Sequence, residues 1–218
     1  QPFKVQIEAG ITAGDYTPTT TTAASNPSAG KYWWSFDGSN DSLLSGNLGI
    51  TDACTIVIAG RVNSLAAPNT FVMEDVNGVQ CYVFNNGAIY LGQPATGTIV
   101  NSATGEIVAG VPFVITFRLS SGAVVIRKNG VQIAAAATAI TFSATTGARI
   151  GIDFNGASFP LNGALGWVVP LPVALSDADC LIVEQLAAAQ FPGLTTPDGD
   201  ALALLLEDGS GFLTMETG

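Results

Sequence analysis

The clearest alternation of apolar and polar positions lies between Val111 and Ala136. The alternating apolar positions at its start are Val111, Phe113, Ile115, Phe117 and Leu119. A period of two is typical of a β-strand, because successive side chains leave opposite faces of a sheet. A break at residues 120–122 ends this strand, a second strand follows, and Asn129-Gly130 predicts a type I′ turn into a third. The stretch predicts an antiparallel meander, which we place at the centre of a sheet.

Further apolar runs of strand length follow one another along the rest of the chain. They are Tyr32–Phe36, Cys54–Val62, Phe71–Asp75, Val79–Phe84, Ala88–Leu91, Ile99–Val100, Ile107–Val108, Ile140–Ser143, Ala148–Phe154, Phe159–Leu161 and Ala164–Val169. Asn-Gly pairs, which favour tight turns, begin at Asn77, Asn86, Asn129, Asn155 and Asn162. Strands spaced by about 8–12 residues with turn signals between them are typical of a sandwich or barrel.

One helix is predicted from Ser176 to Phe191. Ser176 is a good N-cap, and Asp177 and Asp179 lie in the first turn, where the helix dipole favours negative charge. Pro192-Gly193 then ends the helix. The expected apolar stripe is Ala178, Ile182, Leu186 and Ala189. We therefore expect the helix to dock on the sandwich through Ile182 and Leu186.

The two ends of the chain differ from the middle. Residues 1–9 alternate at Phe3, Val5 and Ile7, which predicts a short strand, and the rest of residues 1–30 form a Thr/Pro-rich linker. Residues 31–192 form the sandwich, and residues 193–218 form a loop and a C-terminal hairpin. The chain begins at Gln1, which suggests a processed product or a fragment.

The composition excludes several functions. Charged residues make up 11% of the 218 residues, well below the ~25% of an average domain, and the net charge is −10. The seven basic residues are scattered, so the chain lacks the footprint that nucleic acid or an anionic membrane surface requires. No apolar run approaches the ~20 residues of a membrane helix. The three cysteines have apolar neighbours and are interpreted as small buried side chains, and there is no histidine.

Several segments together resemble the laminin-G-like branch of the concanavalin A-like jelly rolls. In chain order they are Phe36–Asp41, Cys54–Val62, Val125–Val131, Ile150–Gly151 and Asn162–Asp179. The tryptophan usual in the second of these segments is replaced by Gly60 or its neighbour. The resemblance covers about Lys31 to Phe191. It implies an all-β, antiparallel jelly-roll sandwich with one short C-terminal helix and terminal strand extensions.

This family includes lectins, adhesion modules, hydrolases, lyases and phage tail domains, so the fold alone does not give a function. Residues 205–213 resemble the tails of tailed-phage structural proteins. We therefore expect a non-enzymatic virion protein, from a tail fibre, spike or head decoration, that binds a host glycan or a neighbouring virion protein. Self-assembly into a homo-oligomer would use the apolar tail positions Leu204, Leu206, Phe212 and Leu213. The alternative is a secreted, lectin-like carbohydrate-binding module.

A polysaccharide-degrading enzyme is the third possibility. Hydrolases of this fold place paired carboxylates on one strand, but Glu74 and Asp75 are adjacent and would point to opposite faces. Lyases of this fold commonly use histidine, which the chain lacks. We therefore expect no enzymatic activity.

Two kinds of binding site are predicted. An exposed aromatic platform for sugar rings could use Trp33, Tyr90 or Trp167, although an outward tryptophan on a sheet is more often covered by a neighbouring element. Calcium could bind the oxygen-rich side chains of Asp37, Asp41 and Asp153, although such residues usually cap their own turns. No other cofactor is expected.

Overall fold

The computed structural model describes residues 33–190, apart from 47, 52, 76, 96, 121, 138–140 and 144–146, and two short strands near the C-terminus. The predicted strand and linker of residues 1–30 lie outside the described residues, and so do Leu204 and Phe212. Leu206 and Leu213 lie in β13 (Leu205–Leu206) and β14 (Leu213–Thr214), which pair as an antiparallel hairpin. No helix in the described part of the chain is long and apolar enough to cross a membrane.

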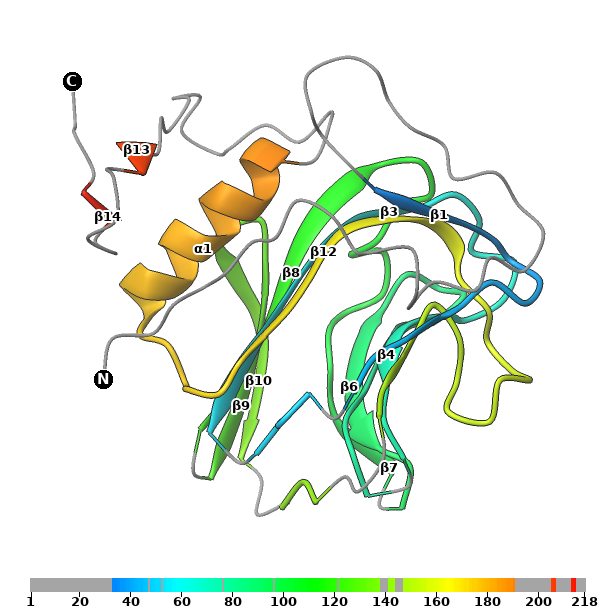
Figure 1. Cartoon of the computed structure of the whole chain (residues 1–218), viewed down its shortest axis with the longest axis horizontal. Coiled ribbons are helices and arrows are strands. Elements are labelled where there is room, and N and C mark those ends of the chain that lie inside the picture. Colours follow the sequence, from blue (N-terminus) through cyan, green and yellow to red (C-terminus); the bar gives the residue numbers. More distant parts are fainter. Residues whose placement is uncertain are drawn as a thin grey trace.

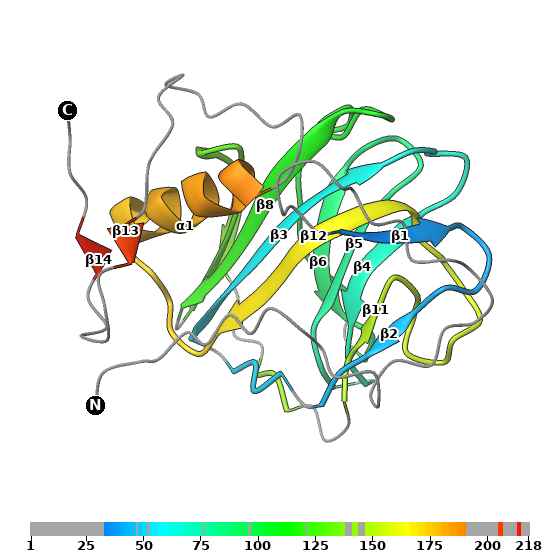
Figure 2. The ribbon, with the colours of Figure 1, turned by 45° about the horizontal axis from the view of Figure 1, so that its top comes forward.

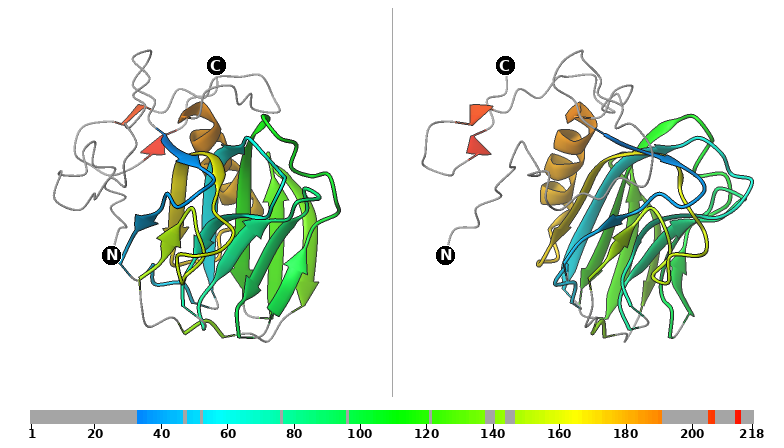
Figure 3. Two further views of the ribbon diagram at one scale, coloured as in Figure 1. Left: turned by 90° about the vertical axis from the view of Figure 1, so that its right-hand side faces the viewer. Right: turned by 45° about the vertical axis from the view of Figure 1, so that its right-hand side comes forward.

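The described chain forms a sandwich of two antiparallel sheets with one helix (Figure 1). The first sheet has the order β1 (Trp34–Asp37), β12 (Asn162–Leu171), β3 (Cys54–Val62), β8 (Pro112–Ser120), β9 (Ala123–Lys128) and β10 (Val131–Ala137). The second sheet has the order β2 (Leu43–Leu44), β11 (Arg149–Ile150), β4 (Asn69–Met73), β5 (Gln80–Val83), β6 (Ile89–Gln93) and β7 (Gly97–Asn101). The helix α1 (Asp177–Gln190) lies against the outer face of the first sheet (Figure 3). The predicted fold class is therefore confirmed.

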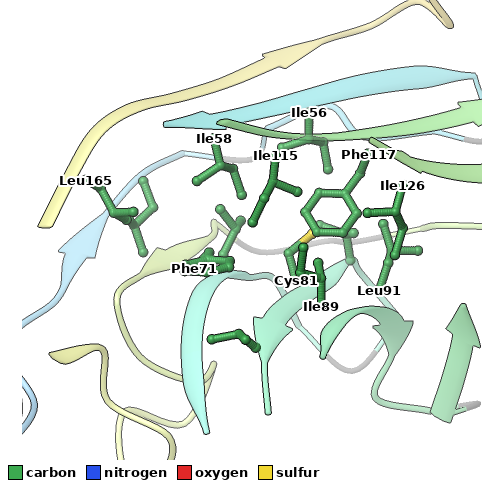
Figure 4. Close-up of a cluster of buried hydrophobic side chains, with 14 of the residues drawn as sticks. Ile56, Ile58, Phe71, Cys81, Ile89, Leu91, Ile115, Phe117, Ile126 and Leu165 are labelled. Carbon is green, nitrogen blue, oxygen red and sulfur yellow. The ribbon is translucent and has the colours of Figure 1, made fainter. Parts of the chain in front are cut away.

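The hydrophobic core lies between the two sheets (Figure 4). Alternate residues of β8 supply one of its walls, and the facing strands β5 and β6 supply Cys81, Ile89 and Leu91. Phe71 and Phe113 meet across the core with ring centroids 5.4 Å apart. Full burial of one such side chain contributes about 1.5–3 kcal/mol. Burial also raises the pKa of the Cys81 thiol well above its usual value, as expected for a cysteine that serves as a small core residue.

The meander that the sequence predicts is present, but it is not at the centre of its sheet. Asn129 and Gly130 both have positive φ, 49° and 85°, which is the geometry of the predicted type I′ turn. Its first strand, β8, lies beside β3 in the interior of the sheet. The meander runs from there to β10, which is an edge strand. Val111 precedes β8 and is 52% exposed, so the inward alternation begins only at Phe113.

Asn162-Gly163 is not a turn, as its sequence suggested, but the start of β12. Asn162 pairs with Asp37, and Gly163 lies between Phe36 and Val62 on the neighbouring strands. A Cβ atom at Gly163 would lie 2.1 Å from the carbonyl oxygen of Arg61. The glycine here therefore permits a close approach of two strands, and long-range pairing overrides the local turn preference.

The predicted strand from Ala148 to Phe154 is only two residues long. Gly151 has a φ of 89°, which a strand cannot contain, and the chain leaves the sheet there. We call residues 151–161 the β11–β12 loop. Asp153 closes it, because its Oδ1 accepts a hydrogen bond of 2.9 Å from the Ala157 N–H. Residues 107–108 and 141–143, also predicted as strands, do not belong to either sheet.

The helix begins where the sequence predicts it, but it docks through a different face. The Asp179 N–H donates to the Ser176 Oγ at 3.1 Å, which confirms the N-cap. Ala178 and Ala189 are exposed, and Ile182 and Leu186 are only half-buried. The buried positions are Cys180, Glu184, Ala187 and Ala188. The expected docking through Ile182 and Leu186 is therefore wrong: small residues allow close approach to the sheet, and an ion pair of Glu184 fixes the rotation of the helix.

Candidate functional site

The outer face of the first sheet is covered by α1. Small and branched side chains of the sheet meet Ala187 and Ala188 of the helix in a second apolar cluster. The sheet residues of this cluster are Val57, Ala59, Val114 and Ala164. Trp33 and Trp167 pack against its margin and are half-buried. Both tryptophans therefore point away from the main core, and a neighbouring element partly covers them.

Charged side chains tie the helix to this face. Arg127 of β9 donates from Nε to Glu184 Oε1 at 2.7 Å and from Nη2 to Oε2 at 3.3 Å. Both side chains are almost fully buried, and the hydrogen bond to Glu184 raises the pKa of Arg127. Arg118 pairs with Asp177 at the start of the helix. Because these charged groups pair with one another, few of their donor and acceptor atoms remain for a ligand.

The outer face of the second sheet has a different character, because aromatic side chains cover it. Tyr82 and Tyr90 are directly opposite one another on β5 and β6, and they point away from the core that their neighbours Cys81 and Leu91 enter. Their ring centroids are 4.1 Å apart. Phe84 packs edge-on against both tyrosines, at 5.0 and 5.6 Å. We call Tyr82, Phe84, Tyr90 and Phe159 the aromatic cluster.

Phe159 is the exposed member of this cluster. Its ring lies nearly parallel to that of Tyr82, with a centroid distance of 6.1 Å and an angle of 12°. Phe159 is 41% exposed, whereas Tyr82 and Tyr90 are 9% and 3% exposed. Phe159 has a φ of 52°, a conformation that typically costs about 1–3 kcal/mol for a residue with a bulky side chain. Its carbonyl oxygen accepts the Thr70 N–H at 3.0 Å, so a strained backbone is held in place to present this ring.

The next row of the same face combines apolar and polar side chains with one charged residue, Arg149. The paired residues of this row, in order across the sheet, are Leu44, Arg149, Met73, Gln80, Gly92 and Thr98. The Tyr90 phenol lies over Gly92, where a Cβ atom would be 2.3 Å from the tyrosine Oη. Figure 2 shows β2, β11 and β4 on the side of the sandwich away from α1. We call this outer face of the second sheet the open face, because α1 covers the other one.

Two buried polar side chains, Thr70 in β4 and Glu74 directly after it, lack complete hydrogen bonding. Thr70 lies opposite Tyr82 on the open face, and its Oγ1 has no partner among the described residues. The same holds for Glu74 Oε1, although Glu74 Oε2 accepts the Val79 N–H at 3.2 Å. Burial raises the pKa of the Glu74 carboxyl, an effect that backbone hydrogen bonding from Val79 and Leu48 partly opposes. Burial also raises the pKa of Tyr82, and the neighbouring Tyr90 adds to the effect.

The predicted calcium residues fall into two separate structural roles. Asp41 Oδ2 accepts the Asp37 N–H at 2.9 Å, and Asp37 Oδ1 accepts the Ser39 N–H at 2.7 Å, so this turn is capped by its own carboxylates. Asp153 is buried in the β11–β12 loop. Among the described residues, no three acidic, cysteine or histidine side chains come close enough to hold a metal ion.

The structure thus divides the predicted sugar-binding residues between two faces. Trp33 and Trp167 lie at the helix side, and Tyr90 lies on the open face but is buried beneath its neighbours. Sequence reasoning missed Phe159 and Arg149. A signal for Arg149 was present, because it is a basic residue in a predicted strand with no acidic residue near it until Asp153.

No profile of a known protein family matches the sequence, and no curated protein matches it. Solved structures of carbohydrate-binding modules do match the fold. The CBM40 domain of the Ruminococcus gnavus IT-sialidase, bound to α2,3-sialyllactose, is 14% identical, with a TM-score of 0.55 over 71% of this chain and 100% of that one. Domain 4 of AbnA, a GH43 extracellular arabinanase from Geobacillus stearothermophilus, in complex with arabinotriose, is 13% identical, with a TM-score of 0.51 over 69% and 87%.

The chain also matches part of a whole enzyme. Trypanosoma rangeli sialidase is 12% identical, with a TM-score of 0.54, and the match covers 71% of this chain but 27% of the sialidase. The chain shares the jelly-roll fold of these modules. At such identities the similarity establishes the fold, which agrees with the lectin-like sandwich that the sequence predicts. The laminin-G branch and the phage origin stay predictions.

Proposed function

We propose that residues 33–190 form a non-catalytic glycan-binding module whose ligand lies on the open face. The main support for this proposal is the exposed ring of Phe159, which a strained backbone holds against Tyr82. Aromatic rings bind the apolar faces of sugars and bring a large contact area with few rotatable bonds. The fold that the chain shares with a carbohydrate-binding module and with an arabinotriose-bound arabinanase domain supports the same proposal.

The surroundings of Phe159 supply the hydrogen bonds that a sugar needs. Asn101 lies opposite Tyr90, and Gln80 and Thr98 lie in the row that contains Gly92. These amide and hydroxyl groups both donate and accept, which suits sugar hydroxyls. The exposed side chains of Phe154 and Phe159, both in the β11–β12 loop, favour binding of a terminal sugar or a short oligosaccharide.

Catalysis is not part of this proposal. Glycosidases need two carboxyl groups on either side of the scissile bond, about 5–10 Å apart. On the described part of the open face, neither of the two rows of residues contains a carboxylate. Glu74 is buried at the end of β4, where its Oε2 accepts a backbone N–H, so it is poorly placed to reach a glycan.

The second candidate is attachment to a virion, with the module as the glycan-binding part of a tail fibre, spike or head decoration. The observation that favours it is the sequence of residues 205–213, which resembles phage structural tails and includes residues of the paired strands β13 and β14. A secreted module is the alternative location. Detection of the protein on purified phage particles, with loss of incorporation after deletion of residues 197–218, tests the virion role.

The glycan proposal predicts that Phe159→Ala weakens binding more than changes at the tryptophans. Loss of one stacked ring should cost about 1.5 kcal/mol, roughly tenfold in Kd. Trp33→Phe and Trp167→Phe, on the helix side, should leave Kd within about twofold. A glycan array identifies the ligands, and calorimetry measures Kd for each variant. If binding is lost with a tryptophan variant and kept with Phe159→Ala, the helix side is the site.

A further inference from the structure

We infer that Arg149 makes the open face selective for acidic glycans, by binding the carboxylate of a sugar with its two terminal nitrogens. This inference rests on the proposed function and adds the chemical class of the ligand. It depends on three observations, which are the pairing of the other basic residues, the free nitrogens of Arg149 and the uncharged surroundings of its guanidinium.

Most basic residues of the described chain already have acidic partners. Arg118 and Arg127 pair with Asp177 and Glu184, and Lys128 pairs with Glu106 at 2.8 Å. The described basic residues that form no ion pair within the described chain are Arg61 and Arg149. Arg61 extends from the helix side of the first sheet, opposite Ala164, and its Nε donates to Asn63 Oδ1 at 3.0 Å. Arg149 is therefore the cation of the open face.

The guanidinium of Arg149 is positioned but not saturated. Its Nε donates to the Phe154 carbonyl oxygen at 3.0 Å, which orients the group along the β11–β12 loop. Gly156 packs beside it, and a Cβ atom there would lie 3.4 Å from Nη1. Neither Nη1 nor Nη2 donates a hydrogen bond to any described residue. One edge of the loop thus holds the arginine by Nε and leaves the two-nitrogen fork for another acceptor.

The neighbours of Arg149 are uncharged. Leu44 and Met73 flank it on the adjacent strands, and Gln80 follows in the same row. Asp153 is the nearest acidic residue along the chain, but its carboxylate is buried and accepts the Ala157 N–H inside the loop. Within the described chain Arg149 is thus a cation without an acidic partner, and its charge is available to an anionic ligand.

The ligand chemistry follows from the shape of this group. Two parallel N–H donors match the two oxygens of a carboxylate, and such charge-assisted pairs are about twice as strong as neutral hydrogen bonds. Two strand spacings, about 10 Å, separate β11 from β5, the strand of Tyr82. One or two linked sugar rings can span this distance. A glycan with its ring on Phe159 could therefore bring a carboxylate to Arg149. The overall negative charge repels polyanions, so the selectivity depends on this local pair.

The test compares matched ligands on matched variants of the full chain. The carboxylate probes are sialyllactose and oligogalacturonate, and their methyl esters are the neutral counterparts. Lactose is the further neutral ligand, and sulfated lactose tests a different anion. The wild type should bind at least one carboxylate probe tenfold or more tightly than its ester. Arg149→Gln should remove that preference, whereas Arg149→Lys should retain only part of it. Arg61→Gln, the matched control, should keep it in full.

The other outcomes are equally decisive. A carboxylate preference that survives Arg149→Gln overturns the inference, and so does equal binding of acids and esters. In that second case, binding that still depends on Phe159 leaves the proposed function standing. Sulfated lactose bound in preference to both carboxylates would assign Arg149 to sulfate instead and overturn the carboxylate class. Absence of binding to every glycan overturns the inference and the proposed function together.

Discussion

The two outer faces of this sandwich use similar strands for opposite purposes. On the first sheet, small residues admit α1, and Arg127 and Glu184 neutralise one another beneath it. Over the second sheet, Phe159 of the β11–β12 loop exposes its ring, and Arg149 of β11 keeps two nitrogens without an acceptor among the described residues. On the first face the charged side chains pair with one another, although the buried Thr116 Oγ1 has no partner among the described residues. On the second face, the terminal nitrogens of Arg149 remain for a ligand to satisfy. The contrast locates function better than the number of aromatic residues does, because both tryptophans that the sequence favoured lie near the helix.

The largest effect is expected from Glu184→Leu, which breaks the ion pair on the covered face. Arg127 would keep a buried charge without its bidentate partner, and loss of one member of a buried pair typically costs about 3–5 kcal/mol. The free energy of unfolding, measured in urea, should fall by this amount. Glycan binding at temperatures where the variant is folded should stay unchanged, because the open face belongs to the other sheet.

The double variant Arg127→Met/Glu184→Leu is the control for this prediction. Replacing a buried pair by apolar residues of similar size is often neutral or even stabilising. Most of the lost stability should therefore return in the double variant. A double variant as unstable as Glu184→Leu alone would show that the helix depends on packing of Glu184 rather than on its charge.

A smaller effect is expected from Gly92→Ala on the open face. The new Cβ atom would displace the Tyr90 phenol, which is packed against Tyr82, and overpacking of this kind costs about 1–3 kcal/mol. Near-ultraviolet circular dichroism should report the changed tyrosine environment, and glycan affinity should fall as well. Gly46→Ala is the matched control: its Cβ atom would meet nothing within 4 Å, so stability should change by less than about 0.5 kcal/mol. Equal effects of the two changes would contradict a packed aromatic face.

The fold could be predicted from the sequence where local and long-range preferences agree. Alternation from Phe113 to Leu119 gives both the strand and its inward face, and the Asn129-Gly130 turn follows its local chemistry. Asn162-Gly163 shows where this reasoning fails. Its local turn preference is real, but pairing with β1 and β3 outweighs it. That pairing joins Gly163 to Phe36 and Val62, which are 127 and 101 residues away in the chain.

The site was harder to predict, because alternation distinguishes two faces without saying which one is outside. Tyr82 and Cys81 are neighbours, and nothing local indicates that the thiol enters the core while the phenol leaves it. Phe159 was interpreted as part of a strand, and its exposure depends on a backbone conformation that no sequence pattern predicts. The free nitrogens of Arg149 depend on which strands flank β11, which is a property of the sheet order.

The smallest effect on stability is expected from Glu74, which lies in the connection between β4 and β5 rather than on either outer face. Burial raises the pKa of its carboxyl above the ordinary value of 4.5, so the folded chain holds this proton more tightly than the unfolded chain. Its contribution to stability is therefore fully present below pH 4.5 and is lost as the pH rises through the folded pKa. The loss amounts to about 1.4 kcal/mol for each pH unit by which the folded pKa exceeds the unfolded pKa.

Glu74→Gln removes this titration. The stability of the wild type relative to Glu74→Gln should therefore increase as the pH falls from about 7 to about 4 in urea unfolding experiments, because the proton that burial favours is bound over that range. A difference that stays constant over this range would mean that the carboxylate finds a partner for Oε1, such as a bound water, and that burial does not disfavour its charged form.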